Sequence, residues 1–151
     1  MEFQRIAIVQ SKKYKNASES FCKCLLKSLK RKGFTLNQIY VFKVSELEDI
    51  PRAVKTLARV EKPAAFTSII AIGVLVKSLN CGNRSKADFL NYSIMKIGLD
   101  FDVHVKNSIL MVDKVPNKKS FWNKLVSNTT RSVQTSNELM NSLTNYIYLD
   151  E

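Results

Sequence analysis

The residues best suited to bind an anion follow the longest apolar run of the chain. Phe66 to Val76 is uncharged and rich in Ile and Val, and the polar loop 77–83 comes directly after it. Phosphate sites use small residues whose N–H groups converge on an oxygen, with a cation nearby. The loop therefore predicts a phosphate or sulfate site, with an ordinary solvated loop as the alternative. The candidate side chains and backbone groups belong to Lys77, Ser78, Asn80, Gly82, Arg84 and Lys86.

Other reactive residue types are sparse and scattered. The acidic group Glu46, Glu48 and Asp49 stands just before Pro51, where carboxylates also favour a helix start, and Asp49 is expected to act as a cap. The single histidine, His104, has no second histidine near it and is expected to be structural or exposed. The sequence has no Walker-type or dinucleotide-binding glycine motif. We therefore expect no metal and no cofactor.

Positive charge is concentrated in the first part of the chain. The formal net charge is +11, and residues 1–43 hold ten basic and two acidic residues. Such a concentration indicates a surface for nucleic acid or another polyanion, or else a solvated helix face. The three cysteines include Cys22 and Cys24 within a helical pattern, so we expect free thiols that are buried or half-buried.

The elements that position these residues alternate along the chain. Arg5–Val9, Gln38–Val44, Phe66–Val76 and Ser108–Val112 have the β-branched and aromatic content of strands. An apolar run without charges is typical of a strand that is covered on both faces of a parallel sheet. At the carboxyl ends of such strands, open α/β sheets bind their ligands. The loop 77–83 is therefore the first place to expect a site.

Helical patterns separate and follow the strands. A capping box formed by Asn16 and Glu19 is expected to start the first helix, and Gly33 to end it. A second helix is expected from Pro51 to Lys62-Pro63. Further helical spacing is shown by Phe89, Leu90, Ile94 and Ile97, by Phe121, Trp122, Leu125 and Val126, and by Leu139, Leu143 and Ile147.

The order β-α-β-α-β-α-β-α-α predicts an α/β protein, a three-layer α/β/α sandwich around a four-stranded parallel sheet. At 151 residues we expect one domain, residues 1–151. The apolar runs are too short to cross a bilayer, and the chain does not open on a secretory leader. The expected location is the cytoplasm, without membrane contact.

Five segments resemble those of the 6,7-dimethyl-8-ribityllumazine synthase family, in the same order. They are RIAIV from Arg5, VSELEDIPRAVKTLA from Val44, IIAIGVLVK from Ile69, NSILMVD from Asn107 and QTSNELMNSL from Gln134. The resemblance implies the flavodoxin-like lumazine synthase fold and a role linked to riboflavin biosynthesis. It also implies a homo-oligomer, either a pentamer or an icosahedral shell of pentamers, with the active site between subunits. Members of that family condense a ribitylaminopyrimidine with dihydroxybutanone phosphate.

The resemblance also implies where a site would lie. The substrate-binding positions of the family fall on Tyr14, Glu46, Leu47, Glu48, Lys77, Ser78, Leu79 and Asn80. The aromatic residue that stacks on the pyrimidine in the family corresponds to Glu48, and its catalytic histidine falls near Lys86. Lys86 and Arg131 are then the remaining candidates for catalytic roles. The family's motif is therefore altered at the residues that move protons and hold substrate.

Three functions are compatible with these residues. The first is a pseudoenzyme that keeps the self-assembling fold and has lost catalysis. The second is an active transferase of the lumazine synthase type that uses Tyr14, Lys86 or Arg131. The third is a basic module that binds a polyanion through the lysine-rich first helix. The first is favoured because core positions agree with the family while pocket positions do not.

Overall fold

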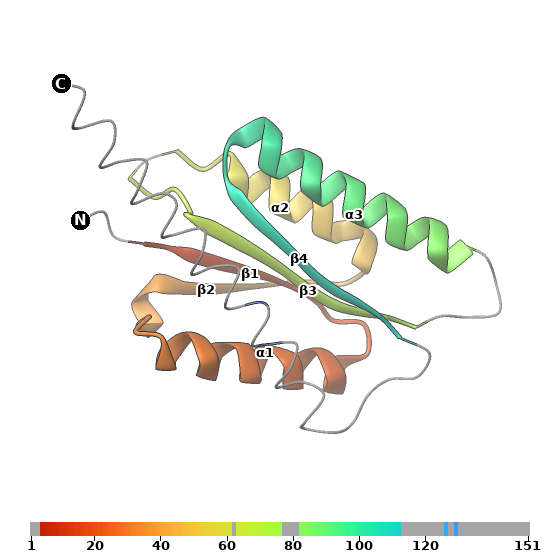
Figure 1. Ribbon diagram of the computed structural model, residues 1–151, viewed down its shortest axis with the longest axis horizontal. Helices are drawn as coiled ribbons and strands as arrows, with labels where there is room; N and C mark the ends of the chain where they lie inside the picture. Colours follow the sequence, from red (N-terminus) through yellow and green to blue (C-terminus); the bar gives the residue numbers. More distant parts are fainter. Residues whose placement is uncertain (1–3, 62, 77–81, 113–125, 127–128, 130–151) are drawn as a thin grey trace.

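The computed structural model describes residues 4–61, 63–76, 82–112, 126 and 129 (Figure 1). Four strands alternate with three helices over these residues, and two short 3-10 turns lie beside β2. The elements are β1 Ile6–Ser11, α1 Lys15–Arg31, η1 Leu36–Gln38, β2 Ile39–Val44, η2 Leu47–Asp49, α2 Ile50–Ala58, β3 Ser68–Val76, α3 Gly82–Phe101 and β4 His104–Val112. The predicted order is confirmed as far as β4.

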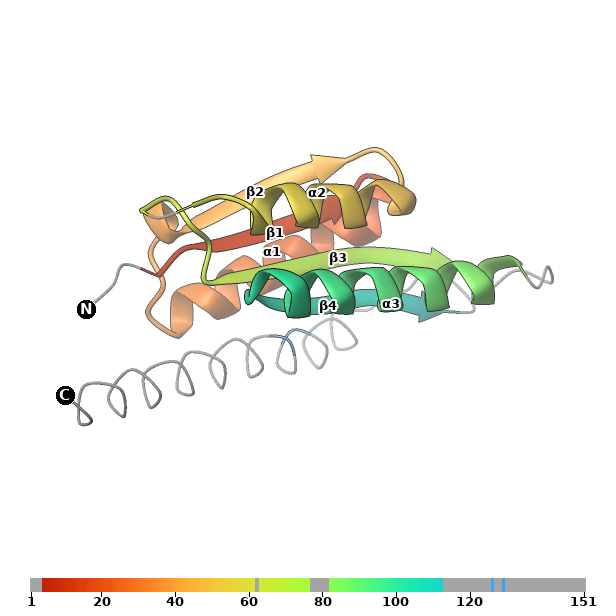
Figure 2. The ribbon, with the colours of Figure 1, turned by 90° about the horizontal axis from the view of Figure 1, so that it is seen from above.

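The strands form one parallel sheet in the order β2-β1-β3-β4. Ile6 of β1 lies opposite Ile39 of β2 on one side and Ser68 of β3 on the other, and Ser68 is opposite His104 of β4. Helix α1 covers one face, and α2 and α3 lie side by side on the other (Figures 1 and 2). The predicted three-layer α/β/α arrangement is therefore confirmed for the described residues.

Two apolar clusters fill the space between the layers. Successive side chains of a strand point to opposite faces, so β1 contributes Ala7 and Val9 to one cluster and Ile6 and Ile8 to the other. The first cluster packs against α2 and α3, and the second packs against α1. All six residues of β1 and the first eight of β3 are buried. The continuous apolar runs in the sequence arise from this two-sided burial.

The start of α1 differs from the expectation, whereas its end agrees. The capping box of Asn16 and Glu19 is wrong, because the helix already begins at Lys15, and Tyr14 precedes it in a left-handed conformation with φ 52°. At the other end, Gly33 has φ +99°, and its N–H donates to the carbonyl of Lys30. The N–H of Phe34 donates to the carbonyl of Leu29, which completes a Schellman motif and confirms Gly33 as the helix stop.

Helix α2 begins with Pro51 in its first turn as expected, but it ends at Ala58, before Lys62-Pro63. The carboxylate of Asp49 does not cap α2. It accepts a hydrogen bond from the N–H of Glu46, so it closes the preceding η2 turn instead. In α3, Leu90, Ile94 and Ile97 are buried as expected. Phe89 was expected on that buried face and instead has 56% of its surface exposed.

The final strand contains the expected Ser108–Val112 and starts earlier, at His104, an extension that the sequence had left open. The expected helical segments after it, around residues 121–126 and 139–147, lie outside the described residues apart from Val126. Val126 is buried with the α1-side cluster, and the hydroxyl of Thr129 lies 3.0 Å from that of Ser108.

Cys22 is buried and Cys24 half-buried, both as free thiols, and Cys81 is outside the described residues. Among the helices described, none has the length and apolar character needed to cross a membrane.

Candidate functional site

The topology of the sheet fixes where a ligand can approach. Strands β1 and β3 are neighbours, but α1 follows β1 on one face and α3 follows β3 on the other. Their connections therefore diverge beyond the carboxyl ends of the two strands, and open α/β sheets usually bind their ligands at such a point. The segments 12–14, 45–49 and the first turn of α3 all follow strands at this edge.

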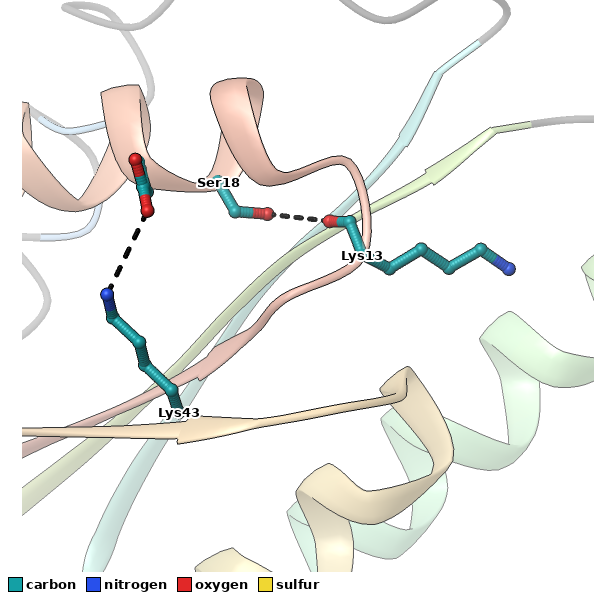
Figure 3. A network of polar contacts seen from close by, with 4 residues as sticks. Lys13, Ser18 and Lys43 are labelled. Atoms are coloured by element: carbon teal, nitrogen blue, oxygen red, sulfur yellow. Dashed lines mark hydrogen bonds and ion pairs between the residues drawn. The ribbon is translucent and has the colours of Figure 1, made fainter.

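The backbone of Lys13 is held firmly at this edge. Its N–H donates to the hydroxyl oxygen of Ser11 at 3.2 Å, and its carbonyl accepts a bond from the hydroxyl of Ser18 at 3.0 Å (Figure 3). The next residue, Tyr14, takes the left-handed backbone conformation, which is uncommon for a residue with a bulky side chain. The ammonium of Lys13 lies 5.9 Å from the centre of the Tyr14 ring. The turn thus presents a cation and an aromatic ring together, both exposed.

The connection from β2 to α2 contributes two exposed carboxylates and one buried anchor. Leu47 has only 1% of its surface exposed and lies in the core, while Glu46 and Glu48 on either side are exposed. A side chain on Gly73 of β3 would meet Leu47, because a Cβ there would lie 2.7 Å from the Leu47 Cδ2. The missing side chain at Gly73 therefore lets Leu47 insert, and this insertion fixes Glu46 and Glu48 at the edge.

Glu48 and Lys86 form an ion pair across the site. Their side chains are 45% and 29% exposed, respectively, so the pair is partly desolvated and still open to solvent. The hydrogen bond from Lys86 lowers the pKa of Glu48, as does a bond from the backbone of Glu48 itself, and the charge of Lys13 acts in the same direction. The Glu48 carboxylate is therefore ionised at neutral pH and lies between two lysines.

Several predicted site residues cannot be placed. Lys77, Ser78, Leu79 and Asn80, which follow β3, lie outside the described residues, and so does Arg131. Of the predicted set, the structure brings together Glu48 and Lys86, with Glu46 in the same turn and Tyr14 in the adjacent one.

His104 lies at the far end of the sheet from this site. It is the first residue of β4, in register with Ser68, the first residue of β3, whereas the candidate site follows the last residues of the strands. Burial lowers its pKa, with a smaller contribution from the charge of Lys106. In the described part of the chain, the Nε2 atom of His104 has no hydrogen-bond partner. A half-buried, structural histidine fits these observations.

Lys13 was not among the predicted site residues. In the resemblance, the family's aromatic residue aligns with Lys13, and Tyr14, one residue away, was predicted to stand in for it, so Lys13 itself was left out of the predicted site. The available signal was its place two residues beyond the end of β1, which puts it at the edge where ligands bind. The residues described in the structure do not group three or more metal-ligating side chains together.

The layers define an α/β protein with a four-stranded parallel sheet, and the candidate side chains lie at the carboxyl edge of that sheet. A family model described as 6,7-dimethyl-8-ribityllumazine synthase matches residues 4–140. This chain belongs to the lumazine synthase family, and its described fold is the lumazine synthase fold.

Individual relatives are distant. The chain is 27% identical over 109 residues to a 6,7-dimethyl-8-ribityllumazine synthase of Paraburkholderia phytofirmans, a match that covers 72% of this chain and 63% of that protein. A protein of the same name from Burkholderia cenocepacia is 26% identical over 109 residues, which cover 72% of this chain and 62% of the relative. The matched region thus spans less than two thirds of the length of these relatives.

Proposed function

We propose that this chain is a pseudoenzyme of the lumazine synthase family: a self-assembling protein that no longer forms lumazine. The observation that carries the proposal is the ion pair between Glu48 and Lys86. By resemblance, position 48 is where the family stacks an aromatic ring on the pyrimidine, and position 86 is near its proton-transferring histidine. In this chain, the two positions hold opposite charges that neutralise each other.

Binding a flat heterocycle at this place would disturb the ion pair. A ring stacked on Glu48 would remove water from the carboxylate and compete with Lys86 for it. Burying a charge without its partner costs several kcal/mol, which is comparable with the whole binding energy of a small substrate. Binding of the family's pyrimidine substrate at this position is therefore unfavourable.

Proton transfer is also compromised. A positioned acid or base typically contributes about 10²- to 10⁴-fold to the rate. A lysine ammonium has no lone pair with which to accept a proton, so Lys86 in its ion pair with Glu48 cannot act as the base. The described part of the site offers no histidine, because His104 lies at the other end of the sheet.

Two exposed apolar surfaces support self-assembly, one on the edge strand β2 and one on helix α3. The edge strand β2 exposes Tyr40, Val41 and Phe42, each by 37% or 38%. Helix α3 exposes an apolar stripe, by which we mean Phe89, Tyr92, Met95 and Leu99, each by 55% to 76%. Monomers rarely expose such contiguous surface. Two different patches on one chain fit a head-to-tail interface, which closes into a ring when the rotation allows.

The stripe adjoins a hollow of about 430 Å³, which includes Met95, Leu99 and His104 in its lining. Helix α3 thus has an apolar stripe on its outer side, next to the exposed polar residues Asp88, Lys96 and Asp100, and none of the described residues buries this stripe. A second copy of the chain would provide that burial. We therefore propose a cyclic homo-oligomer, either a pentamer or a shell of pentamers.

The test combines an absorbance assay for lumazine formation with light scattering. We expect no turnover of the ribitylaminopyrimidine and dihydroxybutanone phosphate, a mass that is a multiple of 17.2 kDa, and binding of a pyrimidine ligand only after Glu48→Phe. Glu48→Gln serves as the matched control, because it removes the charge without adding a ring. Turnover by the unaltered protein, or a monomer at micromolar concentration, would contradict the proposal.

An active synthase is the second candidate, because the relatives bear the name of the enzyme and Tyr14 still offers an aromatic ring at the edge. In that case lumazine formation would be measurable and would disappear in Lys86→Ala or Arg131→Ala. The same assay therefore separates the two candidates.

A further inference from the structure

The exposed face of α1 has a row of positively charged side chains. Lys23, Lys27, Lys30 and Arg31, here called the basic row, are all exposed. Among the residues that the structure describes, none of the four forms an ion pair. The segment 12–32 holds eight basic residues and one acidic residue, so the charge of the whole chain is strongly concentrated on this layer.

Glu19, the acidic residue of segment 12–32, forms its ion pair with a residue outside the basic row. Glu19 lies four residues before Lys23, the favourable spacing for an ion pair on a helix. In the structure, its carboxylate lies 3.9 Å from the ammonium of Lys43 on β2 instead, and Figure 3 shows Lys43 extending toward α1. Among the described residues, no carboxylate therefore pairs with the basic row.

The spacing within the row is unfavourable for the isolated helix. Lys27 has Lys23 four residues before it, Lys30 three residues after it and Arg31 four residues after it. Like charges at these spacings repel each other. Lys30 and Arg31 are at least favoured by the helix dipole, since they lie in the last turn, but Lys23 and Lys27 are not. A bound polyanion would attract these side chains and offset their mutual repulsion.

We propose that the basic row binds the phosphate backbone of a nucleic-acid duplex without sequence preference. At about 1.5 Å per residue, the row from Lys23 to Arg31 extends about 12 Å, the axial length of three to four phosphates of one strand at about 3.4 Å each. Lysine and arginine contacts to phosphate supply affinity and position without reading bases. This surface is separate from the carboxyl-edge site and does not depend on the proposed loss of catalysis.

The chemistry of the face excludes two other kinds of anionic partner. Membrane-bound helices insert their apolar face, but the apolar face of α1, with Phe21, Leu25 and Leu29, is buried against the sheet. Single-stranded nucleic acids are held by stacking on aromatic side chains. The only aromatic residue of α1 is Phe21, which is 3% exposed. A rigid duplex with regularly spaced phosphates fits better than either.

The experiment measures binding of a short fluorescein-labelled DNA duplex of mixed sequence by anisotropy at several salt concentrations. With four phosphate contacts, the logarithm of the binding constant is expected to fall with a slope of about −3.6 in log salt, or about 10²-fold between 50 and 200 mM. Lys23→Gln/Lys27→Gln/Lys30→Gln should reduce the slope by about three for each subunit that contacts the duplex.

Helix α2 supplies a matched control. Arg52→Gln/Lys55→Gln/Arg59→Gln also removes three positive charges, from exposed residues of the opposite layer. The surrounding segment 46–61 holds four acidic and three basic residues, so its charges are of mixed sign. This variant should keep the salt slope of the unaltered protein. Equal losses in the two triple variants, or no binding at low salt, would overturn the proposal. So would tighter binding of polyglutamate than of duplex, which would indicate an acidic protein partner.

Discussion

Glu48 and Lys86 contribute little to the stability of the fold. Their side chains are 45% and 29% exposed, and ion pairs in such positions typically contribute about 0–1 kcal/mol. Their position is more informative than their energy, because they meet at the carboxyl edge, where a ligand would have to separate them. A ligand that itself carries an anion would compete with Glu48 for Lys86 and Lys13, whereas a neutral ring would gain nothing from breaking the pair.

His104 gives a prediction of pH dependence. Burial lowers its pKa in the folded protein, so the unfolded chain takes up a proton at a higher pH than the folded one. The stabilising contribution of the neutral side chain is complete above the unfolded pKa of about 6.5 and is lost as the pH falls below it. We therefore expect the free energy of unfolding, measured with urea, to decrease as the pH falls below about 6.5.

The control for this prediction is His104→Gln, which has no titrating group at that position. Because His104 is the only histidine in the chain, this variant should remove the slope within that pH range. Equal slopes in the two proteins would show that burial of His104 does not couple to stability.

At the scale of single residues, the resemblance predicted which residues form the candidate site, whereas their contacts come from the structure alone. The resemblance assigned both Glu48 and Lys86 to the candidate site. Their ion pair depends on how η2 and α3 pack, and no local sequence pattern encodes that packing. Leu47 illustrates the same limit. The resemblance placed it among the substrate-binding positions, and the structure adds that its side chain lies in the core, where the missing side chain of Gly73 makes room for it.

The junction between β3 and η2 gives a prediction at the scale of elements. Gly73→Ala would place a Cβ 2.7 Å from the Leu47 Cδ2 and 3.4 Å from the Ser11 Cβ. Overpacking of this kind in a core typically costs about 1–3 kcal/mol, so we expect a lower urea midpoint.

A double-mutant cycle identifies the cause. Leu47→Ala alone should cost about 2–5 kcal/mol through the cavity it leaves. Because the shortened side chain also removes the clash, Gly73→Ala should cost less in the Leu47→Ala background than in the unaltered protein, by at least about 0.5 kcal/mol. Strictly additive costs would mean that the two residues do not meet.

Helix α1 gives a second prediction. Lys27→Gln removes three like-charge contacts, each of which typically destabilises a helix by about 0.2–0.5 kcal/mol. The variant should therefore unfold at a higher temperature than the unaltered protein at low ionic strength, and the difference should shrink in high salt, which screens exposed charges. Lys55→Gln on α2 removes a charge from a segment of mixed sign and should bring no such gain. A lower unfolding temperature for Lys27→Gln would contradict the repulsion.

The elements that the sequence described poorly are those governed by distant contacts. The capping box of Asn16 and Glu19 was a sound local signal, yet Ser18 bonds to the backbone of Lys13 and Glu19 pairs with Lys43, so packing on β1 and β2 decided where α1 begins. Phe89 was grouped with the buried residues of α3 because it stands beside Leu90, and the exposed side of that helix also has apolar residues, among them Tyr92. Periodicity cannot indicate which side faces the core when both sides are apolar.

For the whole molecule, the apolar stripe of α3 predicts the state of assembly. Met95→Gln/Leu99→Gln places two amides in the centre of the stripe, and unpaired polar groups in an interface are costly. We expect sedimentation analysis to show a shift from the assembled form toward the 17.2 kDa monomer, with the circular dichroism of the fold unchanged.

Lys96→Gln/Asp100→Asn is the corresponding control. It changes two exposed polar side chains of the same helix, each one residue beyond a changed position, and keeps every apolar side chain of the stripe. This variant should assemble like the unaltered protein. If both variants assemble normally, the stripe is not an interface between copies of the chain.

The place of β1 in the sheet has a consequence for how the chain emerges during synthesis. β1 is made first but lies between β2 and β3, so it needs partners from residues 39–44 and from residues 68–72. When the ribosome has released only β1, α1 and β2, the edge of β1 that pairs with β3 is open, and Ala7 and Val9 are without the α2-side layer. Open strand edges invite pairing with other chains. The nascent protein is therefore most exposed to misassociation until Ser68–Val76 leaves the exit tunnel.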